Sequence, residues 1–213
     1  MRLWYRGWQL ASQVGFTCYF GLRVFHRENV PKKGPVLLVS NHQSFLDPVL
    51  CGIGLPRELD YIARDSLFRN RLFAWYIRSL NAFPIQRAQA DIAAIRTIVK
   101  RLQQGRAVVL FPEATRTTEG RIRTIKGGFE LIARRARATT VPVVIDGAFE
   151  TWPRHKRIFS MGNIKVMYGA PVPPEQIANM NRQDFVRLIN QRMYRMHNEL
   201  RHRYGKTTYN YED

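Results

Sequence analysis

The sequence predicts an α/β fold, in which a mostly parallel or mixed sheet in a single domain carries helices on both faces. Short apolar runs alternate along the chain with longer segments whose apolar residues recur at helical spacing. The runs are apolar throughout, which is typical of strands covered on both faces. With 213 residues, 45% of them hydrophobic, the chain is large enough for one domain with a sizeable core.

An N-terminal amphipathic helical segment is expected ahead of this domain, so we divide the chain into residues 1–29 and 30–213. The first part is expected to form two short helices. One helical face carries Arg2, Arg6, Gln9 and Gln13, and another carries Trp4, Trp8, Ala11, Cys18, Leu22 and Phe25. Tryptophans beside arginines are typical of a helix in a membrane interface, and residues 7–22 are too short and polar to span a membrane. The alternative is a helix packed on the protein's own core.

The elements of the domain are expected in alternation along the chain. Strands are expected at 36–39, 61–63, 82–85, 107–110, 141–145 and 164–168. Helices are expected at 48–55, 70–80, 90–104, 127–137 and 182–203. A Pro- and Gly-containing turn at 31–35 leads into the first strand, and Gly105 ends the helix at 90–104.

Composition limits the partners and the compartment. Lys+Arg 34 against Asp+Glu 16 gives a net charge of +18, which favours nucleic acid, an anionic lipid surface or acidic substrates. Charge alone does not choose among these partners. Cys18 and Cys51 lie among apolar residues without metal-ligand spacing, so we expect buried free thiols in a reducing compartment.

The segment Asn41–Asp47 follows the first apolar run and places a histidine and a carboxylate close together. His42 is suited to take a proton from an alcohol, and Asp47 to hold the imidazole and stabilise its charged form. Residues five apart on a continuous helix point about 140° apart, so the dyad requires a turn. The alternative is Asp47 as a helix N-cap before Pro48 and His42 as an ordinary loop histidine.

The chain contains no GxSxG segment, so a serine acyl-enzyme is not indicated. Ser44 is expected to bond within the turn. A dyad without a protein nucleophile fits direct transfer, in which the hydroxyl of a substrate attacks.

A second polar cluster follows the run at 107–110. Glu113 is suited to orient a hydroxyl and Arg116 to clamp a phosphate, although a surface ion pair is the alternative. Further cations in this region are Arg121, Arg123 and Lys126, before Gly127 and Gly128, with Arg87 after the strand at 82–85. Together they indicate a phosphate site. His42, Asp47, Glu113 and Asp146 have no metal-ligand spacing, and we expect no metal.

Four ordered segments resemble motifs of the lysophosphatidic acid acyltransferases, the PlsC-like glycerolipid acyltransferases. Asn41–Asp47 matches the NHxSxxD motif at every specified position. Residues 81–87, 111–116 and 141–145 resemble the second, third (FPEGTR) and fourth motifs. Asn81 and Ala114 stand where the family commonly has glycine. If Ala114 requires positive φ, it costs on the order of 1 kcal/mol, whereas Asn tolerates such angles.

The resemblance implies a glycerolipid acyltransferase fold and the roles of particular residues. His42 would be the general base and Asp47 its partner, while Glu113, Arg116, Arg87 and Lys126 would bind the acceptor. The family transfers an acyl group from acyl-CoA or acyl carrier protein, as co-substrate and without a cofactor, to a lysophospholipid hydroxyl. We therefore expect lysophosphatidic acid as acceptor, phosphatidic acid as product and no nucleic acid partner.

The resemblance also places the protein on the cytoplasmic face of a membrane, as a peripheral or monotopic enzyme on an anionic surface. Two alternatives remain open. One is a non-enzymatic basic module that binds anionic membrane or nucleic acid, although no nucleic-acid-binding motif is visible. The other is an acyltransferase with a different acceptor, such as glycerol-3-phosphate or another lysolipid.

Overall fold

The computed structural model describes residues 1–85, 92–125, 127–153, 156 and 158–211. Its centre is a seven-stranded sheet in the order β1-β7-β6-β2-β5-β3-β4. The strands are β1 (Arg23–Phe25), β2 (Val36–Ser40), β3 (Leu59–Arg64), β4 (Ala82–Ile85), β5 (Ala107–Leu110), β6 (Thr139–Asp146) and β7 (Lys165–Tyr168). Neighbouring strands are parallel except β6 and β7. The predicted mixed α/β sheet is confirmed.

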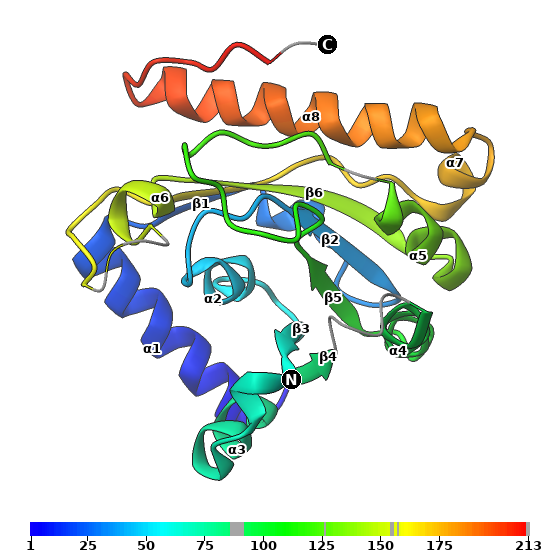
Figure 1. The fold of residues 1–213 in the computed structure, drawn as a ribbon, viewed down its shortest axis with the longest axis horizontal. Coiled ribbons are helices and arrows are strands. Elements are labelled where there is room, and N and C mark those ends of the chain that lie inside the picture. The colour runs from blue at the N-terminus through cyan, green and yellow to red at the C-terminus, as the bar shows by residue number, and fades with distance from the viewer. Residues whose placement is uncertain (86–91, 126, 154–155, 157, 212–213) are drawn as a thin grey trace.

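Helices cover both faces of the sheet (Figure 1). They are α1 (Leu3–Phe20), α2 (Asp47–Gly52), α3 (Arg71–Ser79), α4 (Ile92–Gln103), α5 (Gly128–Ala136), α6 (Ala148–Thr151), α7 (Pro174–Ala178) and α8 (Arg182–Arg203). Helices α4, α5 and α8 pack on one face, and α1 and α2 on the other. The expected strands and longer helices are present with ends shifted by a few residues. The short helices α6 and α7 have no counterpart among the expected elements.

Strand β2 shows why the apolar runs form the centre of the sheet. All five of its residues are buried. Because side chains alternate across a strand, Leu37 and Val39 enter the core beneath α4, α5 and α8, while Val36 and Leu38 enter the core beneath α1 and α2. A polar residue at any of these four positions would be buried without water.

The expectation of two short helices in residues 1–29 is wrong. One helix, α1, ends at Gly21, whose positive φ of 49° lets the chain leave the helix. Residues Arg23–Phe25 then pair with β7 as an edge strand, and a 3-10 turn follows at Arg27–Asn29. Three residues are too few for a periodic pattern to distinguish an edge strand from a helix. The division of the chain at residue 29 stays a prediction.

Helix α1 turns much of its apolar surface outward. Gln9 is buried, and its Nε2 donates to the carbonyls of Gly52 and Leu55 at 2.6 and 2.9 Å. Exposed positions of α1 include Leu3, Trp4, Leu10, Val14 and Tyr19. The free thiol of Cys18 is also exposed, so the expectation that it is buried is wrong, whereas Cys51 is buried as expected. Cys18 lies on the outer face because the inward positions are taken by Tyr5, Gln9, Ser12 and Phe20.

Candidate active site

The polar segments after β2 and β5 lie at one edge of the sheet. Because β2, β5 and β6 are parallel neighbours, their carboxyl ends point to the same edge. This edge therefore receives Asn41–Asp47 from β2 and Phe111–Arg116 from β5. The structure thus brings together two clusters that are about seventy residues apart in the sequence.

A turn places the His42 ring against the Asp47 carboxylate, with 2.7 Å between Nδ1 and Oδ2. The same Oδ2 accepts hydrogen bonds from the backbone N–H groups of Gln43 and Ser44 at 2.6 and 2.8 Å. Asp47 is therefore not the N-cap of α2: it is the first residue of the helix, and its carboxylate points back into the turn. With Asp47 accepting from Nδ1, the imidazole presents the Nε2 lone pair to a substrate.

The segment after β5 packs against both the ring and the backbone of His42. Phe111 stacks on the imidazole, with 4.4 Å between ring centroids. The N–H of His42 donates to Glu113 Oε1 at 3.2 Å, and the N–H of Thr117 donates to the His42 carbonyl at 2.8 Å. The imidazole is thus fixed on several sides while its side chain stays 20% exposed.

Glu113 is a buried carboxyl with an unusual protonation equilibrium. Burial raises its pKa to about 8, and the nearby charge of Asp47 acts in the same direction, while the His42 N–H and Arg123 oppose the rise. Within the described part of the chain its Oε2 has no hydrogen-bond partner. Near neutral pH this carboxyl can therefore hold a proton and donate it to an oxygen of a bound molecule.

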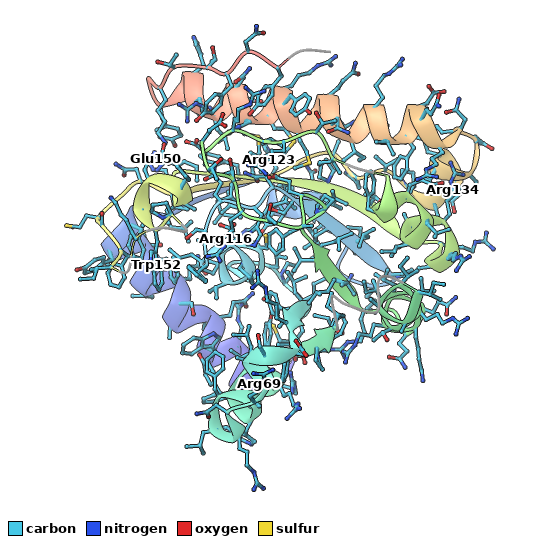
Figure 2. All side chains as sticks on the ribbon, viewed as in Figure 1. Arg69, Arg116, Arg123, Arg134, Glu150 and Trp152 are labelled. Carbon is cyan, nitrogen blue, oxygen red and sulfur yellow. The ribbon has the colours of Figure 1, made fainter. Side chains whose placement is uncertain are left out.

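Cations lie on the segment that leads from β5 to α5. Figure 2 shows Arg116 and Arg123 near the middle of the molecule, whereas Arg69 lies at the α3 end. The Arg116 guanidinium lies 3.4 Å from the centroid of the Phe45 ring, which belongs to the His42 turn. Arg123 donates to Thr118 Oγ1 at 3.2 Å. The two other expected phosphate contacts, Arg87 and Lys126, lie outside the described residues.

The remaining polar residues of the turn hold it in place, a role that the sequence predicted only for Ser44. Asn41 exchanges two hydrogen bonds with the backbone of Ile145 on β6, at 2.8 and 2.9 Å. Gln43 Nε2 donates to the Gly120 carbonyl at 2.7 Å. Ser44 accepts from Leu46 N–H within the turn, as expected, and also donates to the carbonyl of Trp152 at 2.8 Å. Their position directly after a buried strand is the sequence signal for such contacts.

The structure shows the backbone conformation at the two positions where the family commonly has glycine. Asn81 and Ala114 have φ of 67° and 59°, in the left-handed region. The positive φ on which the predicted strain at Ala114 depends is therefore present. The Asn81 side chain also accepts from Arg2 at 2.6 Å and donates to Glu58 at 2.8 Å, contacts that glycine could not make.

Asp146, at the end of β6, belongs to a different cluster. Its carboxylate accepts from His197, Arg201 and Lys206 at 3.2, 3.0 and 2.7 Å. Burial would raise the pKa of Asp146, but the hydrogen bonds from His197 and Lys206 hold it below its usual range. In the described residues no group of three or more His, Cys, Asp or Glu side chains is arranged to hold a metal ion.

Comparisons with known proteins give consistent matches. A family model described as Acyltransferase matches residues 21–146. The 1-acyl-sn-glycerol-3-phosphate acyltransferase of Bacillus subtilis is 28% identical over 195 residues, which cover 89% of this chain and 95% of that protein. The Streptococcus pneumoniae protein of the same name is 31% identical over 147 residues, covering 68% of this chain and 53% of that protein.

A solved structure matches the fold as well. It is the 1-acyl-sn-glycerophosphate (LPA) acyltransferase PlsC from Thermotoga maritima, with a TM-score of 0.81 and 25% identity. The match covers 92% of this chain and 79% of that one. The arrangement of sheet and helices is therefore shared over nearly the whole chain.

Proposed function

The chain belongs to the Acyltransferase family and is an O-acyltransferase, and we propose that it acylates the free hydroxyl of lysophosphatidic acid to give phosphatidic acid. This acceptor is the one named for the Bacillus subtilis and Thermotoga maritima proteins. The single observation that carries the proposal is the His42–Asp47 pair, joined at 2.7 Å beside a basic segment. The acyl donor is a thioester, either acyl-CoA or acyl carrier protein.

The proposed reaction follows from the geometry of the pair. Nε2 of His42 takes the proton of the acceptor hydroxyl while the hydroxyl oxygen attacks the thioester carbonyl carbon. Asp47 stabilises the imidazolium that forms, and two backbone N–H groups keep its carboxylate oriented. The tetrahedral intermediate then breaks its C–S bond, and the leaving thiolate takes the proton from His42. An ester and a free thiol result, with no protein-bound intermediate.

The acceptor phosphate is assigned to the basic segment. Arg116 lies over the Phe45 ring of the turn, and the charge of Arg123 acts on Glu113, which bonds to the turn at His42. Arg87 and Lys126 are proposed as further contacts on the strength of their motif positions. The protonated carboxyl of Glu113 would donate to an oxygen of the acceptor and so position its hydroxyl near His42.

We also propose that the protein binds the cytoplasmic face of an anionic membrane peripherally. None of the described helices is long and apolar enough to cross a bilayer. Helices α1 and α3 lie side by side, because Trp4 Nε1 donates to Ser79 Oγ at 3.0 Å and Trp8 packs edge-on against Tyr76 (Figure 1). Both helices expose apolar side chains, which include Leu3, Leu10, Val14, Leu72, Phe73 and Trp75. Such a surface on a protein of charge +18 is suited to an anionic lipid interface.

Acyl transfer by purified protein tests the proposal. Acyl-CoA and acyl carrier protein are each offered with lysophosphatidic acid, glycerol-3-phosphate and other lysolipids, and products are identified by mass spectrometry. We expect phosphatidic acid, with a fall in kcat of about 10²–10⁴ in His42→Ala and Asp47→Asn. Unchanged transfer by His42→Ala would refute the mechanism. A gel shift with nucleic acid at physiological ionic strength, without any acyl transfer, would support the non-enzymatic alternative.

A further inference from the structure

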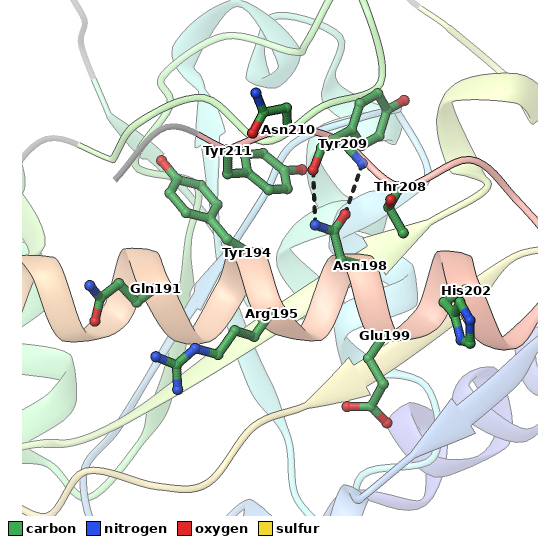
Figure 3. A pocket seen from close by; sticks show the side chains of 10 residues that line it. All are labelled: Gln191, Tyr194, Arg195, Asn198, Glu199, His202, Thr208, Tyr209, Asn210 and Tyr211. Carbon is green, nitrogen blue, oxygen red and sulfur yellow. Dashed lines mark hydrogen bonds between the residues drawn. The ribbon is translucent and has the colours of Figure 1, made fainter.

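Residues 206–211, here called the strap, turn back after α8 and run along that helix (Figure 1). The side chain of Asn198 on α8 holds the strap at Tyr209, since it accepts from the Tyr209 N–H and donates to the Tyr209 carbonyl, both at 2.9 Å (Figure 3). Arg201 adds a hydrogen bond to the carbonyl of Thr207 at 2.6 Å. The strap is therefore fixed on the helix through its backbone, which leaves its tyrosine hydroxyls to make other contacts.

The two tyrosine hydroxyls of the strap reach the segment between β5 and α5. Tyr209 donates to the carbonyl of Glu119 at 3.2 Å, and Tyr211 accepts from the N–H of Ile122 at 3.2 Å. The packing at Gly120 is tight: a Cβ there would lie 3.0 Å from the Tyr209 hydroxyl and 3.2 Å from Phe149. The strap thus holds the backbone of residues 119–122 from outside.

A buried histidine anchors the second tyrosine. His197 Nδ1 lies 2.5 Å from the Tyr211 hydroxyl, and its Nε2 lies 3.2 Å from Asp146 Oδ1. Burial lowers the pKa of His197, which favours the neutral ring. In that form Tyr211 donates to Nδ1, and Nε2–H donates to Asp146, so every polar atom in the series has a partner.

The segment held by the strap also holds the catalytic turn from the other side. The carbonyl of Gly120, next to Glu119, accepts from Gln43 Nε2 at 2.7 Å. The backbone N–H of Gln43 in turn donates to Asp47 Oδ2 at 2.6 Å. A continuous series of hydrogen bonds and short backbone links therefore runs from Asn198 on α8 to the carboxylate that contacts His42.

We propose that Tyr209 is a positioning residue for the acyl transfer: its hydroxyl fixes the Glu119–Gly120 backbone, which holds Gln43 and thereby the Asp47 carboxylate. The same segment leads to Arg123, whose charge acts on Glu113 beside the turn, so the strap also places a cation for the acceptor phosphate. This inference rests on the proposed function. It predicts that a hydroxyl outside the substrate site affects the catalytic step.

Tyr209→Phe tests the inference, because it removes the hydroxyl and keeps the ring that packs against Arg201. We expect kcat to fall about three- to tenfold, in line with the loss of one hydrogen bond, with the KM for the donor unchanged. The acid limb of the kcat/KM profile should also move to lower pH, because a less firmly held carboxylate stabilises the imidazolium less. A purely structural role would not move that limb. Tyr204→Phe is the matched control, since the Tyr204 hydroxyl contacts Arg23 and not residues 119–122.

Three further variants make the result decisive. Gln43→Ala combined with Tyr209→Phe should lower kcat little more than Gln43→Ala alone, because both changes interrupt one series. Asn198→Ala removes the two hydrogen bonds to the Tyr209 backbone and should also lower kcat. This variant replaces Tyr209→Phe in the test if Tyr209→Phe does not fold. Wild-type kcat and pH profile in folded Tyr209→Phe, or an equal loss in Tyr204→Phe, would overturn the inference. Absence of acyl transfer by the wild-type protein would instead overturn the proposed function.

Discussion

Glu113 accepts a hydrogen bond at 3.2 Å from the backbone N–H of His42, a residue 71 positions earlier in the chain. The bond joins the segment after β5 to the turn after β2, so the segment proposed to bind the acceptor and the proposed general base form one structural unit. It also explains why the Glu113 carboxyl is buried beside Asp47, the arrangement that makes its charged form unfavourable. A change at either residue should therefore affect the other.

The protonation of Glu113 predicts a pH dependence of stability. Its pKa is about 8 in the folded protein against an ordinary value of 4.5, so the folded state binds one more proton between these values. Unfolding releases that proton, and this residue's contribution to stability is lost as the pH rises from about 4.5 to about 8. Relative to wild type, Glu113→Gln should gain unfolding free energy over this range, by at most about 1.4 kcal/mol per pH unit.

Urea unfolding of both proteins at several pH values checks this prediction. Glutamine can still accept from the His42 N–H, so the comparison isolates the titration. Glu175→Gln, on the outer helix α7, is the control and should show no such trend. A constant difference between Glu113→Gln and wild type from pH 5 to pH 8 would show that the carboxyl is ionised throughout.

The sheet and the His42–Asp47 turn were predictable because both are encoded locally. Each of the runs at 36–39, 107–110 and 141–145 is apolar throughout, and a strand buried on both faces requires such a run. The parallel arrangement then places the residues that follow β2 and β5 at one edge. The contact between His42 and Asp47 was predictable for the same reason, because both residues lie within one turn of seven residues.

The contacts that fix the turn were not predictable, because each joins segments far apart in the chain. Gln43 meets Gly120, and Tyr209 meets Glu119, through backbone carbonyls that any residue type supplies. The inward face of α1 was not predicted for a related reason. Gln9 is polar and has the sequence pattern of a surface residue, but it is buried because it donates to the carbonyls of Gly52 and Leu55. The spacing of polar residues along the sequence does not distinguish a side chain that bonds to a buried carbonyl from one that is exposed to water.

Replacing Ala114 by glycine is expected to stabilise the protein. Ala114 has φ of 59°, where a Cβ is strained and glycine is not. The gain is up to about 1 kcal/mol, reduced by the greater freedom of glycine in the unfolded chain. Thermal unfolding measures it, with Ala94→Gly in α4 as the control, which should lose about 1 kcal/mol. Equal losses in the two variants would mean that position 114 does not require positive φ.

The apolar surface of α1 predicts vesicle binding that can be weakened without unfolding the protein. Leu10 and Val14 are 45% and 64% exposed, so Leu10→Ser with Val14→Ser should leave the core intact. If both side chains enter the lipid, the affinity for phosphatidylglycerol-containing vesicles should fall roughly tenfold or more. Leu131→Ser, on α5 at the opposite face, is the matched control in a sedimentation assay. Equal effects of the two changes would place the membrane contact elsewhere.

The contact between Arg116 and Phe45 predicts how the acceptor phosphate is held. Phe45 is 52% exposed on the His42 turn, and the Arg116 guanidinium lies over its ring, with 3.4 Å to the ring centroid. Lysine keeps the charge but lacks the planar group, and leucine keeps the apolar bulk but lacks the ring. Arg116→Lys and Phe45→Leu should each raise the KM for lysophosphatidic acid about three- to tenfold, with smaller effects on kcat, in steady-state assays. Because both remove one contact, the double variant should raise the KM little further. Independent, multiplying effects would show that Arg116 binds the phosphate without support from the ring.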